Sequence, residues 1–69
     1  MSITKLADYC KDIFLATVKE KNISESIFME QLNQYIYTVI EKYELSALSA
    51  TAFTICMKDL IVYHMYKHT

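Results

Sequence analysis

The sequence predicts an all-α fold, a small antiparallel bundle of three helices that forms a single domain over residues 1–69. Two observations carry this prediction: the chain contains no glycine and no proline, and its apolar residues recur at helical spacing. Hairpin turns favour residues that accept a positive φ, so the lack of glycine argues against an all-β fold. The expected helices cover residues 3–21, 25–44 and 47–67.

The first two helices each show one apolar stripe flanked by polar residues. Ser2 is a suitable N-cap for the first helix, and Asn22 is a suitable left-handed residue for its end. Ser24 is the expected N-cap of the second helix, where Ile23 and Phe28 occupy the positions of a hydrophobic staple. The stripes comprise Ile3, Leu6, Ala7, Cys10, Ile13, Phe14 and Val18, then Phe28, Leu32, Tyr35, Ile36, Val39 and Tyr43.

The stretch YELSALSATAF, residues 43–53, allows two interpretations. In the first it is a corner, with Ser46 or Ser49 as the N-cap of a third helix and with Leu48 and Phe53 as a staple around Ser49. In the second it continues one helix of about 44 residues, roughly 65 Å long, which could not fold back on itself. The corner is favoured because serine is common in caps and helix lengths then stay ordinary.

The third helix is apolar almost all round and is expected to supply most of the core. A membrane span is disfavoured because Lys58 and Asp59 lie in its middle. The residues expected in the core are Phe53, Ile55, Cys56, Met57, Leu60 and Ile61.

The composition indicates a protein that is covered by another polypeptide. Hydrophobic residues make up 54% of only 69 positions, more than so small a chain can enclose. We therefore expect a homodimer or another protein partner. All the basic residues are lysines and the net charge is −1, which argues against direct nucleic-acid binding.

The two cysteines, Cys10 and Cys56, are expected to be reduced thiols of a cytoplasmic protein, with a disulfide between them as the alternative. His64 and His68 are four residues apart and would share a helix face, but two ligands do not hold a metal, and no third ligand is evident. We expect no metal site and no cofactor. No acid, base and nucleophile set is recognisable, so an enzyme is not expected.

Six tyrosines are many for this length, and tyrosine suits interfaces because it buries a large ring while its hydroxyl stays wet. The predicted partner-binding residues are Tyr37, Tyr63, Met65 and Tyr66. The predicted function is a non-enzymatic protein-binding module, a small regulator, inhibitor or chaperone-like protein that occludes a surface of its target. The alternatives are an accessory factor for transcription or the nucleoid that acts through a protein partner, and a metal-binding helical protein.

One short segment resembles a known family. Val39 to Ser46, VIEKYELS, is similar to part of the haemolysin-modulating family of small helical nucleoid-associated proteins, which bind a DNA-silencing protein. In that family two residues separate the two tetrapeptides, and this chain lacks them. No functional residue is carried over from the resemblance.

Overall fold

The computed structural model describes residues 2–19 and 23–67, and these form three helices with no strand among them. Helix α1 spans Ile3–Lys19, α2 spans Glu25–Lys42 and α3 spans Ala47–Lys67. The all-helical prediction is therefore confirmed. The expected end of the first helix, at Lys21 and Asn22, lies outside the described residues.

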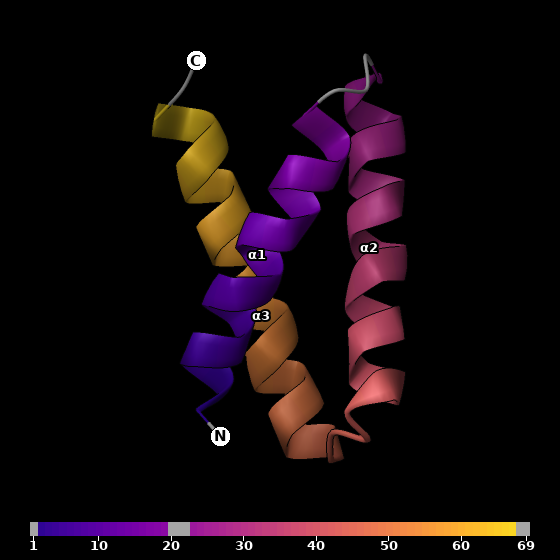
Figure 1. The fold of residues 1–69 in the computed structure, drawn as a ribbon, viewed down its shortest axis with the longest axis vertical. Coiled ribbons are helices and arrows are strands. Elements are labelled where there is room, and N and C mark those ends of the chain that lie inside the picture. Colours follow the sequence, from indigo (N-terminus) through magenta and orange to yellow (C-terminus); the bar gives the residue numbers. More distant parts are fainter. Residues whose placement is uncertain (1, 20–22, 68–69) are drawn as a thin grey trace.

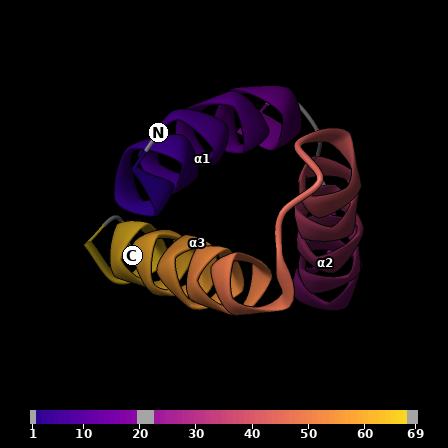
Figure 2. The same ribbon diagram turned by 90° about the horizontal axis from the view of Figure 1, so that it is seen from below.

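Helices α1 and α3 cross each other, and α2 lies beside them (Figure 1). The chain rises through α1, descends through α2 and rises again through α3. Seen from below, the three helices surround a common interior (Figure 2). Most of the close contacts between helices join α1 to α3, so this crossing is the main packing interface of the fold.

The core is built on the crossing of α1 and α3. Phe53, Met57 and Ile61 of α3 are fully buried, and Ala7 and Cys10 of α1 are buried in the same core cluster. The remaining buried residues are Leu6, Phe14, Val18, Leu32, Ile36 and Val39.

An aromatic cluster ties α2 to α1. The ring of Phe14 lies 5.4 Å from that of Phe28 in an edge-to-face arrangement and 5.5 Å from that of Tyr35. Such pairs contribute roughly 0.5–1.5 kcal/mol each beyond the area they bury. Helix α2, which makes few close backbone contacts with either of the other helices, is held against α1 by these rings.

Each helix begins at a serine whose hydroxyl caps the backbone. The Lys5 N–H donates to Ser2 Oγ (3.4 Å), the Ile27 N–H to Ser24 Oγ (3.3 Å) and the Ser49 N–H to Ser46 Oγ (3.2 Å). The caps predicted at residues 2 and 24 are confirmed. Of the two candidates for the third helix, the structure selects residue 46.

The stretch between Tyr43 and Phe53 is a corner, as favoured, and α2 ends there in a hydrogen-bonded motif that needs a left-handed residue. The Glu44 N–H donates to the Glu41 carbonyl (3.2 Å), and the Leu45 N–H donates back to the Ile40 carbonyl (3.1 Å). This is the bonding pattern of a Schellman motif. Glu44 takes the position usually given to glycine, with φ of 50°. The chain therefore reverses direction without glycine.

Some residues assigned to the apolar stripes are exposed, which corrects those predictions. Ile13 lies at the edge of its stripe and is 40% exposed, and Tyr43 follows the last turn of α2 and is 39% exposed. Ile55 was expected in the core but is 57% exposed, because it lies about 200° around α3 from the buried Met57. The predicted staple around residue 49 is also wrong, since Leu48 is 83% exposed. Cys56 and Leu60 are partly buried against the core.

Candidate functional site

The most unusual surface of the molecule is the outer side of α3, which carries large apolar side chains into solvent. Leu48, Ile55 and Val62 recur every seven residues and so share one side of the helix. They are 83%, 57% and 59% exposed, and Tyr63 and Tyr66 beside them are 64% and 82% exposed. We call these five residues the α3 outer face. Exposed large apolar side chains gathered on one side of a helix are typical of an interaction site.

The sequence of α3 explains why this face exists. Apolar residues occur on all sides of the helix, while its crossing with α1 buries only the side of Phe53, Met57 and Ile61. The opposite side has no helix of the described chain to cover it. Its apolar residues are therefore left at the surface by the packing of the core.

Two charged residues interrupt the outer face near its midpoint. Lys58 and Asp59 are both exposed, and neither makes an ion pair within residues 2–19 and 23–67. By contrast, Lys11 of α1 is bound to Asp8 at 3.0 Å and to Asp12 at 3.2 Å. The α3 charges are thus available to a group outside this chain.

The four predicted partner-binding residues do not form a single cluster. Tyr37, which is 69% exposed, lines a depression of about 430 Å³ between α2 and α3, together with Ile55 and Lys58. Tyr63 and Tyr66 line a second depression of about 550 Å³, which Lys58 also borders. The three tyrosines therefore flank one lysine on adjoining surfaces.

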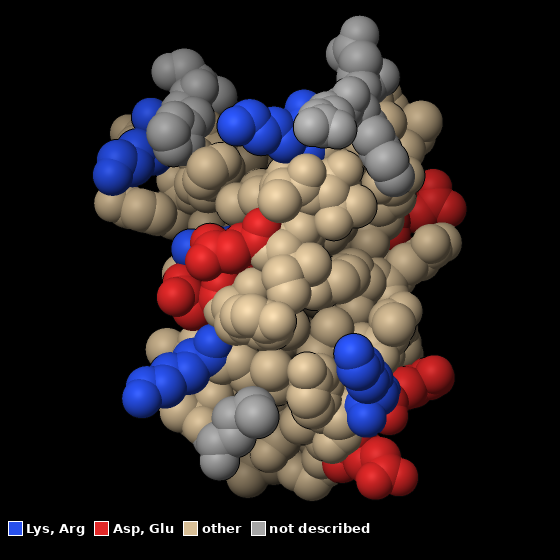
Figure 3. Space-filling view, viewed as in Figure 1, with Lys and Arg blue, Asp and Glu red and all other residues tan. Residues whose placement is uncertain are grey.

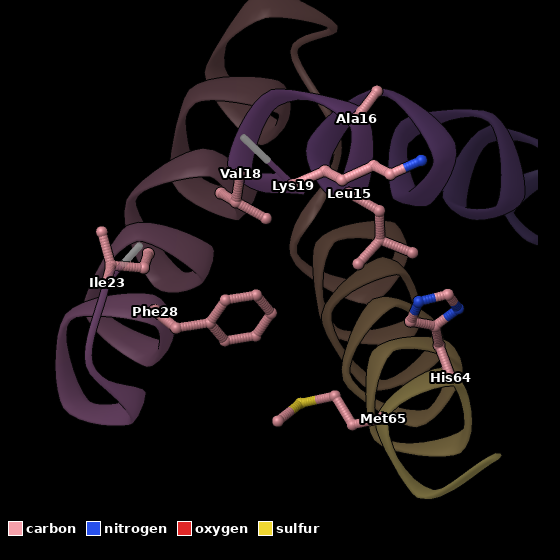
Figure 4. A pocket seen from close by; sticks show the side chains of 8 residues that line it. All are labelled: Leu15, Ala16, Val18, Lys19, Ile23, Phe28, His64 and Met65. Atoms are coloured by element: carbon pink, nitrogen blue, oxygen red, sulfur yellow. The ribbon is translucent and has the colours of Figure 1, made fainter. Parts of the chain in front are cut away.

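Met65, the fourth predicted residue, is in a different location. It is partly buried and lines a groove of about 560 Å³ between the C-terminal half of α1, the start of α2 and the end of α3. The side chains of Leu15, Val18 and Phe28 face the same space (Figure 4). The structure thus places Met65 apart from the tyrosines.

The same groove contains His64, the described member of the predicted histidine pair. His64 lies near its rim, as does the long side chain of Lys19 (Figure 4). His68 lies outside the described residues. Among the residues that the structure describes, no three His, Cys, Asp or Glu side chains converge in a way that could hold a metal ion.

The thiol of Cys10 faces the hydroxyl of Tyr35 between α1 and α2. Burial raises the pKa of the Cys10 thiol, although hydrogen bonding to Tyr35 and the charge of Lys42 oppose this. Burial, together with the neighbouring Cys10, raises the pKa of Tyr35 to about 12. Both groups are therefore protonated at neutral pH. Cys10 and Cys56 are both free thiols, so the disulfide alternative does not hold.

The charges on the side of the molecule that α1 and α2 present are mixed. Positive and negative side chains are interspersed there and lie mostly around its margin, with uncharged side chains in the middle (Figure 3). This side shows no continuous basic surface of the kind that tracks a phosphate backbone. Along the described parts of the chain, no helix has the length and hydropathy needed to cross a membrane.

Sequence reasoning missed Leu48, Ile55 and Val62 as candidate site residues. Their seven-residue spacing, opposite a second apolar series at residues 50, 53, 57 and 61, was the available signal. Comparison of the chain with protein-family models, curated proteins and solved structures gave no match. The similarity at Val39 to Ser46 thus has no support from a family match, and the structure divides that segment between the end of α2 and the corner.

Proposed function

We propose that this protein is a non-enzymatic protein-binding module, a small regulator, inhibitor or chaperone-like protein, whose contact surface is the α3 outer face. The observation that carries the proposal is the exposure of all five of its large apolar residues, from 57% at Ile55 to 83% at Leu48. Leaving that area in water is unfavourable by about 25 cal/mol for each Å². A second polypeptide that covers the face recovers this free energy.

The tyrosines support the same proposal. The rings of Tyr63 and Tyr66 provide large contact areas with little loss of side-chain entropy on binding, and their hydroxyls suit the wet margin of an interface. Lys67 lies 6.0 Å from the centre of the Tyr63 ring, which adds a weak cation–π contact on the same side of α3. Tyr37 extends the surface across the α2–α3 depression.

The proposed mechanism is occlusion. Helix α3 would lay its outer face on an apolar surface of the target, in the manner of helices that bind in grooves. The proposal includes three features that are expected from the sequence, namely an antiparallel bundle, a homodimer and a cytoplasmic location. An accessory transcription or nucleoid factor that acts through a protein partner would use the same surface, and the identity of that partner distinguishes the two roles.

The test is site-specific photo-crosslinking in the cells that naturally produce the protein. A benzophenone amino acid replaces Val62 on the outer face, and a matched control replaces Asp12, which is exposed on α1. We expect discrete crosslinked products from position 62 that unlabelled wild-type protein competes away, and none from position 12. Equal, non-competable labelling at both positions, or no product at position 62, would contradict the proposal.

A further inference from the structure

We infer that the α3 outer face pairs with the same face of a second copy, with the two α3 helices antiparallel and a two-fold axis at the level of residue 57. This inference rests on the proposed function and specifies one partner for the same surface. Because a two-fold interface brings one patch against itself, that patch must be complementary to itself. The pattern along α3 meets this requirement.

The outer side of α3 carries a coiled-coil seam in addition to the stripe that faces the core. One series is Leu48, Ile55 and Val62, and the other is Ala52, Asp59 and Tyr66, so that successive members alternate by four and three residues. From the first to the last residue the seam is about 27 Å long. It therefore runs along most of the molecule, whose longest dimension is 33 Å.

An antiparallel seam pairs a member of one series with a member of the other. With the axis at level 57, Leu48 faces Tyr66 of the second copy, and Ala52 faces Val62 of the second copy. The Ala52–Val62 layer joins a small side chain to a larger one, which favours interdigitation, and the Leu48–Tyr66 layer joins two large apolar side chains. The layers repeat on the other side of the axis by symmetry.

The position of Asp59 in the seam favours the antiparallel direction. In this arrangement Ile55 faces Asp59 of the second copy. Lys58 of the first copy then lies three residues, about 4.5 Å along the axis, from the level of the Asp59 carboxylate of the second copy. The two Lys58 residues also lie within two residues of each other's level, about 3 Å along the axis, so two cations and two carboxylates gather around the axis and their charges balance. A parallel pairing would bring Asp59 against Asp59 and Ala52 against Ala52, which gives like-charge repulsion and a packing defect.

The first test reverses these charges and measures self-association by sedimentation equilibrium. We expect the wild type to form a dimer, and K58D and D59K each to raise the dimer dissociation constant by about tenfold, because each change leaves four charges of one sign around the axis. The double variant K58D/D59K restores the opposite charges and should return to within about threefold of the wild type. Both residues are exposed, so circular dichroism should show unchanged helicity in all variants.

The second test fixes the direction by disulfide trapping in a C56S background, where Cys10 is buried. A52C and V62C are oxidised separately and as an equimolar mixture. We expect a covalent dimer of mixed composition in the mixture and little in either variant alone, since like positions lie about 15 Å apart along an antiparallel pair. Efficient linkage of V62C to itself would overturn the antiparallel arrangement.

The outcomes separate the two proposals. A wild type that remains monomeric at millimolar concentration overturns the self-pairing. If crosslinks from position 62 then lead only to a different protein, the binding function stands with another occupant. The proposed pairing is also overturned if K58D and D59K each weaken the dimer and the double variant K58D/D59K does not restore it.

Discussion

Replacing Glu44 with glycine should stabilise the protein, although it removes a side chain and adds flexibility to the unfolded chain. Glu44 is held at φ of 50° by the two backbone bonds that close α2, from its own N–H to Glu41 and from the Leu45 N–H to Ile40. A residue with a Cβ pays about 1–2 kcal/mol in this left-handed conformation. Glycine has no Cβ, so it adopts this conformation without the steric penalty.

The expected gain is smaller than that cost. Glycine loses more backbone entropy on folding, which offsets roughly 0.5–1 kcal/mol. The net stabilisation from Glu44→Gly should therefore be about 0.5–1 kcal/mol. For a domain of this size that corresponds to a rise in melting temperature of about 2–8 °C. The change leaves the bonds from residues 44 and 45 in place.

The assay is urea unfolding at one fixed protein concentration, with two controls. Glu44→Gln removes the charge from the C-terminal end of α2 but keeps the Cβ, so this variant should be stabilised by only about 0.3 kcal/mol. Glu30→Gly, at an exposed position within α2, should destabilise by about 1 kcal/mol. If Glu44→Gly is no more stable than Glu44→Gln, the left-handed conformation at this residue does not carry the cost assigned to it.

Two further predictions concern the α1–α2 contact. The pKa of the Tyr35 hydroxyl is raised from 10.0 to about 12, so the unfolded protein loses the hydroxyl proton at a lower pH than the folded protein does. Protonated Tyr35 therefore contributes its full stabilisation below pH 10, and this contribution is lost as the pH rises towards 12. Urea midpoints measured from pH 8 to 12 should fall less steeply in Tyr35→Phe, and parallel curves would refute this assignment. In the native protein a thiol reagent should modify Cys56 well before Cys10, which is only 2% exposed, and C56S should remove the fast phase. A fast phase that survives in C56S would show that Cys10 is accessible.

The three helices and their caps could be predicted because the interactions that set them are local. Each serine hydroxyl bonds a backbone N–H three residues ahead, and this spacing is visible in the sequence. The corner was also predictable from its serines. The residue that makes the turn was less evident, because glutamate has no particular preference for a positive φ. Only the bonds of Glu44 and Leu45 to the preceding turn identify it.

The predicted partner-binding residues differ in exposure. The tyrosines at 37, 63 and 66 are exposed, as a surface role requires, whereas Met65 packs against the core. The expectation that Ile55 would be buried failed, because both sides of α3 are apolar and periodicity alone does not distinguish them. The binding role of these residues stays a prediction.

By itself the sequence determined that the chain is helical, where its helices begin and that it holds more apolar side chain than it can enclose. The tertiary structure alone decided which side of α3 is left outside. The physical reason is the crossing with α1, which buries in the core the side of α3 that bears Phe53, Met57 and Ile61. Once that side is buried, Ile55 and Val62 necessarily face away, and the surface proposed for binding follows from this choice.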